Sequence, residues 1–112
     1  MNTVTISVSS PEETRQRFLC ALQGKPQGAH ISFESVELLW KVLAPNRLAL
    51  IRALTGAGVV PIREAARRVG RDVRAVHADV TMLVGAGVLR RAEGGIVFPY
   101  DSVHVDFMVK AA

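Results

Sequence analysis

Arginine is the residue type whose abundance and spacing most clearly indicate a chemistry in this 112-residue sequence. Residues 47–91 contain nine arginines and three acidic residues, which gives this stretch a formal charge of +6. The whole sequence carries only +4, because the segments on either side are neutral or acidic. A guanidinium group forms paired hydrogen bonds with a phosphate or with the edge of a guanine. The arginine-rich stretch therefore predicts an acidic partner, and nucleic acid is the first candidate.

The arginines fall on a segment whose pattern predicts two short helices joined by a tight turn. The first helix spans residues 62–69 and presents small alanines on its inner face. Gly70 permits a sharp reversal of the chain, and Asp72 can cap a second helix over residues 73–86. The inner face of the second helix is expected to consist of Val73, Val76, Val80 and Leu83. This order is typical of a helix-turn-helix, in which the second helix enters the major groove of DNA.

Eleven residues are candidates for DNA contact. The outer side and flanks of the second helix carry Arg74, Ala75, His77, Ala78 and Thr81. Arg74 and Thr81 are best placed to reach base edges, and Arg74 favours guanine. Phosphate contacts are expected from the bracing helix through Arg63, Arg67 and Arg68. Arg71, in the turn, is expected to reach a phosphate or a base.

A β-hairpin is predicted after the second helix. Two runs, 88–91 and 95–98, flank the sequence Ala-Glu-Gly. Arg90 and Arg91 lie in the first run. The hairpin resembles the wing of a winged helix-turn-helix, so these two arginines are expected to touch the flanking backbone or the minor groove.

The ends of the sequence predict two strands. Residues 4–8 and 103–109 alternate apolar and polar side chains, which is the period of a half-buried strand. We expect these strands to pair with each other or across a dimer. Ser10 can cap a helix that ends at Gly24, and the apolar stripe of that helix comprises Phe18, Leu19 and Leu22.

Two further helices are expected between the N-terminal elements and the arginine-rich pair. The first begins after Ser35, and its buried face is expected to comprise Val36, Leu39, Trp40 and Leu43. Pro45 ends this helix and begins the next, whose apolar side comprises Leu48, Ile51 and Leu54. Arg47 and Arg52 lie off that apolar side, so they could reach solvent or a phosphate.

The sequence thus predicts one α+β domain over residues 1–112, a winged helix-turn-helix with N- and C-terminal strands flanking a helical core. Residues 1–28 form a strand and helix that could serve a dimer or a partner. Residues 34–99 form the DNA-binding core, and residues 102–110 form the C-terminal strand.

Several motifs resemble those of known regulators. Residues 43–51 (LAPNRLALI), 62–70 (IREAARRVG) and 87–89 (GVL), together with Val76, are similar to the MarR- and ArsR-type winged-helix proteins. The segments 37–43 (ELLWKVL), 69–73 (VGRDV), 76–80 (VHADV) and 98–101 (FPYD) resemble a family of small prokaryotic antitoxin-like regulators. Members of that family are often encoded beside a RelE-like toxin. One departure is Pro61, which stands where a capping serine or threonine is expected.

The sequence offers little for catalysis or for metal binding. Cys20 is the single cysteine, and His30, His77 and His104 lack metal-ligand spacing. His104 and Asp106 would share one face of a strand, which is most simply a surface pair. We therefore expect no enzymatic activity, no metal and no cofactor. No apolar run approaches the ~18 residues of a membrane span and no signal peptide is recognised, so a cytoplasmic protein is expected.

The function that fits best is sequence-specific binding of double-stranded DNA by a homodimeric transcriptional repressor. The resemblance implies that the protein is also the antitoxin of a type II toxin–antitoxin pair, with a RelE-like toxin as its partner. Two alternatives stay open: a stand-alone winged-helix repressor without a toxin, and a protein-interaction module that has lost DNA binding.

Overall fold

The computed structural model describes residues 2–24 and 28–109, and it is a mixed α+β structure, as predicted. Its residues group into two compact units. One is drawn from Met1–Lys41 and Ser102–Ala112, and we call it the terminal unit. The other is Val42–Asp101, which we call the central unit.

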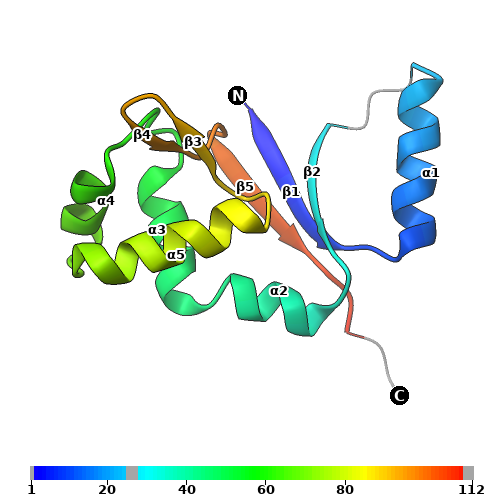
Figure 1. The fold of residues 1–112 in the computed structure, drawn as a ribbon. Coiled ribbons are helices and arrows are strands. Elements are labelled where there is room, and N and C mark those ends of the chain that lie inside the picture. Colours follow the sequence, from blue (N-terminus) through cyan, green and yellow to red (C-terminus); the bar gives the residue numbers. More distant parts are fainter. Residues whose placement is uncertain (1, 25–27, 110–112) are drawn as a thin grey trace. The chain divides into compact units, whose positions relative to one another are not determined.

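The terminal unit is built on a three-stranded sheet in the order β2-β1-β5, with β1 (Thr3–Val8) between β2 (Ala29–Phe33) and β5 (Ser102–Asp106) (Figure 1). Both neighbours run parallel to β1, and Ile6 is paired with Ile31 on one side and Val105 on the other. The prediction that the two end strands pair with each other is therefore confirmed. The expected strand 103–109 is shorter in the structure and ends at Asp106.

β2 is an element that the sequence prediction lacks. Its residues alternate, with His30 and Ser32 exposed while Phe33 is buried. Five residues beside a glycine-containing loop are too short a pattern to predict a strand by themselves. Its partner β1 supplies the hydrogen bonds that stabilise it, and no local pattern reveals that partner.

Two helices belong to the N-terminal half of the chain, α1 (Pro11–Leu22) and α2 (Val36–Val42). The predicted caps are confirmed. The Ser10 hydroxyl accepts a hydrogen bond from the backbone N–H of Glu13, and the Ser35 hydroxyl accepts one from that of Leu38. Each cap satisfies one of the N–H groups that a first helical turn leaves without a partner.

Side-chain burial on these helices differs from the prediction. No residue of α1 is buried, and its apolar stripe faces outward, with Phe18 61% and Leu22 69% exposed. Leu39 and Leu43 are buried as predicted, but the prediction for Trp40 is wrong, since it is 52% exposed. The Trp40 ring makes an edge-on contact with Phe107, with 5.4 Å between ring centroids. Helical spacing identified an apolar face, but it could not show which part of that face would be covered.

The central unit contains α3 (Pro45–Leu54), α4 (Ile62–Val69), α5 (Val73–Gly85) and an antiparallel hairpin of β3 (Arg90–Ala92) and β4 (Gly95–Val97). The boundaries of α4 agree with the prediction, and α5 begins as predicted but ends one residue earlier, at Gly85. Gly70 joins them in the left-handed conformation, with φ at +67°, and Asp72 caps α5 through the N–H of Arg74 at 3.1 Å. Pro61 stands at the N-cap position of α4, and no side-chain hydrogen bond caps this helix.

The hairpin is tied to the segment that precedes α4. Val60 exchanges two backbone hydrogen bonds with Ile96, at 2.8 and 3.0 Å. Gly95 lies so close to this segment that a Cβ atom would come within 2.2 Å of the Val60 carbonyl oxygen. The segment before α4 therefore acts as a third, one-residue strand beside β4.

The core of the central unit includes both alanines of α4, Ala65 and Ala66, whose small side chains allow α5 to approach closely. The expected inner face of α5 is only partly correct. Val76, Val80 and Leu83 are buried, but Val73 is 41% exposed. The buried face instead includes the acidic residue Asp79. Asp79 follows Val76 by three residues and precedes Val80 by one. Because a helix turns by 100° per residue, all three side chains lie on the same side of α5.

Candidate nucleic-acid interface

All eleven predicted contact residues lie in the central unit, on α4, the α4–α5 turn, α5 and β3. Nine of them are exposed: Arg63, Arg67, Arg68, Arg74, His77, Ala78, Thr81, Arg90 and Arg91. Ala75 and Arg71 are partly buried. The fold therefore leaves most of the predicted set available to a partner.

The outer side of α5 presents Arg74, His77, Ala78 and Thr81 to solvent. Their spacing of three, four and seven residues places them in one row along the helix. The Arg74 side chain has no hydrogen-bond or ion-pair partner within residues 2–24 and 28–109. All its guanidinium donors are thus available for an incoming ligand.

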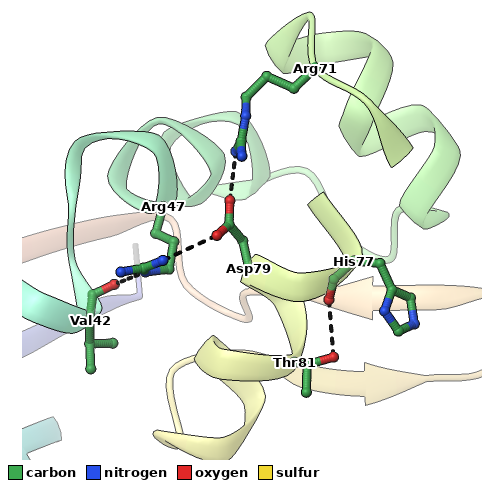
Figure 2. Close-up of polar contacts among 6 residues, drawn as sticks. All are labelled: Val42, Arg47, Arg71, His77, Asp79 and Thr81. Carbon is green, nitrogen blue, oxygen red and sulfur yellow. Dashed lines mark hydrogen bonds and ion pairs between the residues drawn. The ribbon is translucent and has the colours of Figure 1, made fainter. Parts of the chain in front are cut away.

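Thr81 can offer a base only part of what a free hydroxyl offers. Its hydroxyl donates a hydrogen bond to the backbone carbonyl of His77, at 3.0 Å (Figure 2). A hydroxyl has one donor, so Thr81 retains acceptor lone pairs and its methyl group. It could therefore accept from the amino group of adenine or cytosine, or contact a thymine methyl.

The arginines on α4 are not equivalent. Arg67 donates to both carboxylate oxygens of Glu64, at 2.9 Å through Nε to Oε2 and at a shorter distance through Nη2 to Oε1. Arg68 Nε donates to Glu64 Oε1 at 3.1 Å. The hydrogen bonds from Arg67, and then that from Arg68, lower the pKa of Glu64 from 4.5 to about 2. Arg63 has no such partner in the described part of the chain, so it is the α4 arginine most available to a phosphate.

Arg71 is held by a buried acid. Its Nη1 donates to Asp79 Oδ2 at 2.6 Å, and Arg47 Nη1 donates to Asp79 Oδ1 at 3.1 Å (Figure 2). Arg47, which the sequence placed toward solvent, also donates through Nε to the carbonyl oxygen of Val42 at 2.6 Å. The side chain of Arg47 is only 17% exposed, so it is an internal residue of this unit.

Asp79 is the polar residue that the sequence prediction missed. The signal was present, because Asp79 falls on the apolar side of the predicted helix, next to Val80 and three residues after Val76. A charge at such a position requires a partner when the helix packs. The many arginines in the surrounding sequence indicate that this partner is an arginine.

β3 directs its two arginines to opposite faces of the hairpin. Arg90 is paired with Val97, and Arg91 is paired with Ile96, which is buried. Paired residues share a face and successive residues alternate, so Arg91 lies on the side of the core. Arg90 lies on the other face of the hairpin, and both arginines are exposed.

The net charge of the chain resides in the central unit. This unit holds nine arginines and five acidic residues, which gives +4, whereas the basic and acidic residues of the terminal unit are equal in number. The two units thus differ in the partners they can attract, and only the central unit favours a polyanion.

Two other kinds of site are not found in the described residues. Residues 2–24 and 28–109 contain no group of three histidine, cysteine or acidic side chains that could hold a metal ion. His104 and Asp106 are both exposed on β5, each beside a residue of β1. Across the same ranges, no helix has both the length and the apolar character that crossing a membrane requires.

Comparison with known proteins identifies a family. No curated protein and no solved structure matches the chain. The family match spans residues 42–105, which includes the whole central unit and most of β5. The family description, HVO_A0114, names no activity. Because the match covers more than half of the sequence, the chain belongs to the HVO_A0114 family.

Proposed function

We propose that this protein is a transcriptional regulator that binds double-stranded DNA, and that its central unit is a winged helix-turn-helix. The observation that carries the proposal is the row of exposed residues on α5, which starts with Arg74, whose side chain has no partner among the described residues. The elements around it have the order expected of this fold: α3, a short strand at Val60, α4, a left-handed glycine turn, α5 and a hairpin.

In this proposal α5 lies in the major groove and α4 braces it from behind. Arg74 binds the O6 and N7 edge of a guanine, while Thr81 provides an acceptor or a methyl contact. Arg63 and Arg90 bind phosphates on either side of the groove, which positions the protein without reading sequence. Arg67 and Arg68 join them when a phosphate displaces the Glu64 carboxylate.

The test is fluorescence anisotropy with labelled duplexes selected from a random library by the protein itself, each compared with a scrambled duplex. Arg74→Ala is expected to weaken binding to the selected duplex by about 1–3 kcal/mol and to relax the preference at one base pair. Arg15→Ala is the matched control, since Arg15 is an exposed arginine of the neutral terminal unit. Equal losses in the two variants, or no enrichment of any duplex, would contradict the proposal.

A second role is supported by the surface of the terminal unit. Eight of the eleven large apolar side chains that are exposed in the described residues belong to it: Phe18, Leu19, Leu22, Leu38, Trp40, Val105, Met108 and Val109. An apolar surface without net charge suits association with protein better than association with DNA. We propose that this unit forms a homodimer and receives a RelE-like toxin, which would make the protein the antitoxin of a toxin–antitoxin pair.

Co-expression with the product of an adjacent small toxin gene tests the antitoxin role. A stable complex, and growth rescue that requires the terminal unit, are the expected results. Rescue without a complex would contradict it. DNA binding without any toxin interaction would favour a stand-alone repressor, and a toxin complex without DNA binding would favour a pure interaction module.

A further inference from the structure

Asp79 is the only charged residue that is buried within residues 2–24 and 28–109, with 8% of its surface exposed. It lies on α5, on the side opposite the row that carries Arg74. A buried carboxylate is costly to keep ionised unless hydrogen bonds and opposite charges surround it. The partners of Asp79 therefore determine how α5 can be placed.

Those partners come from two other elements of the central unit. Arg47 belongs to the first turn of α3, and Arg71 belongs to the turn between α4 and α5. The carboxylate receives one hydrogen bond from each, at 3.1 and 2.6 Å, and Figure 2 shows one guanidinium group at each of its two oxygens. We call Arg47, Arg71 and Asp79 the clamp. It joins α3, the turn and the middle of α5 through a single side chain.

We infer that Asp79 is a positioning residue of the DNA interface, which orients α5 through Arg47 and Arg71 and touches no DNA itself. This inference rests on the proposed function. Side chains that read base edges must be held within about 0.5 Å of their productive geometry. Apolar packing of small buried residues such as Ala65 is non-directional, whereas charge-assisted hydrogen bonds from two guanidinium groups to one carboxylate fix direction as well as distance.

The inference assigns Arg71 a different role from that of the exposed arginines. Its side chain is 24% exposed and is directed to Asp79, whereas Arg74 has no partner among the described residues. Arg71 accordingly sets where α5 begins, and it does not provide one of the phosphate contacts.

The direction in which one substitution changes DNA affinity distinguishes a positioning role for Asp79 from a purely electrostatic one. Removal of an acid from a DNA-binding surface ordinarily strengthens binding, because it raises the local positive charge. If Asp79 positions α5, Asp79→Asn weakens binding to a specific duplex instead. Glu64→Gln is the matched control, because it also removes an acid bonded to two arginines, but at a half-buried site on α4, where the side chain is 31% exposed.

The experiment measures anisotropy with a duplex selected by the wild-type protein and with its scrambled counterpart, over a range of salt concentrations. Asp79→Asn is expected to lose roughly tenfold or more in the ratio of selected to scrambled affinity. Glu64→Gln is expected to bind both duplexes more tightly. Unchanged or stronger selective binding by Asp79→Asn would overturn the inference.

Arg71→Gln is the second variant, in case Asp79→Asn does not fold, because it leaves Asp79 paired with Arg47. Its ratio of selected to scrambled affinity is expected to fall as far as that of Asp79→Asn. The slope of log affinity against log salt concentration is expected to stay unchanged. A slope smaller by about 0.9, with equal losses on both duplexes, would mean that Arg71 contacts a phosphate, and it would overturn the inference.

Amide hydrogen exchange of α5 in the absence of DNA distinguishes failure of the clamp from failure of the proposed function. Arg71→Gln is expected to exchange faster than the wild type along α5 even if the protein selects no duplex. Equal exchange in the two proteins would overturn the clamp, whatever the DNA result.

Discussion

Glu64 provides a prediction at the scale of a single residue. Hydrogen bonds from Arg67 and Arg68 lower its pKa to about 2 in the folded protein, against 4.5 for the unperturbed group. Because the folded pKa is the lower one, the interaction contributes its full stabilisation above pH 4.5 and loses it as the pH falls through about 2. An NMR titration of the Glu64 carboxyl should find its midpoint near the lower value. The double variant Arg67→Ala/Arg68→Ala should return the midpoint toward 4.5, and an unchanged midpoint would contradict this assignment.

Gly95 provides a second prediction at this scale. Its φ is +155°, and a Cβ atom would lie 2.2 Å from the Val60 carbonyl oxygen, so even alanine must displace the backbone pair that links β4 to Val60. Gly95→Ala should lower the free energy of unfolding by about 2 kcal/mol, measured by urea denaturation. Gly94→Ala is the control. Its Cβ would meet only Val59 Cγ1 at 3.9 Å, so it should cost about 1 kcal/mol, the cost of a left-handed φ. Equal costs for the two variants would refute the steric account.

The residues of the candidate interface could be predicted from the sequence to the extent that helical spacing decides exposure. Arg74, His77 and Thr81 lie on the outside of α5 because the apolar residues of that helix lie on the inside. Spacing does not reveal which arginines form ion pairs within the protein. Arg71 and Arg47 meet Asp79 only because the fold brings together positions 8 and 32 residues apart in the sequence.

The hairpin provides a prediction at the scale of an element. Arg90 and Arg91 are neighbours in sequence, but they lie on opposite faces of β3. Arg90→Ala should lower the salt dependence of DNA binding by about one phosphate contact, whereas Arg91→Ala should change it much less. Anisotropy titrations at several salt concentrations measure both slopes. Equal slopes for the two variants would show that the hairpin does not bind DNA through one face.

Elements with strong local signals could be predicted, and those that depend on distant partners could not. Ser10, Ser35 and Asp72 cap their helices as expected, since a cap uses the backbone next to it. β2 escaped prediction because its strand hydrogen bonds come from β1. Helical spacing alone predicts that Trp40 is buried, but no neighbouring element covers it fully, and 52% of its surface is exposed.

At the scale of the whole molecule, charge and apolar surface are divided between the two units. If the terminal unit forms the dimer, the double variant Phe18→Glu/Leu22→Glu should convert the protein to a monomer in sedimentation velocity. Both side chains are exposed, so the variant should keep the thermal stability of the monomeric fold. Specific DNA binding should weaken, because two half-sites are no longer bound together. A dimer that persists would place the interface outside α1.

The pairing of β1 with β5 also has a consequence for synthesis of the chain. The hydroxyls of Thr3 and Ser102 lie 2.6 Å apart although 99 positions separate them in the sequence. At roughly 5–20 residues per second, a ribosome makes β5 about 5 to 20 seconds after it has made β1. The residues of the central unit are made within that interval, and the last of them, Asp101, directly precedes β5. During that interval the edge of β1 that β5 later covers has no partner strand within the chain, so it is open to chaperones or to another chain.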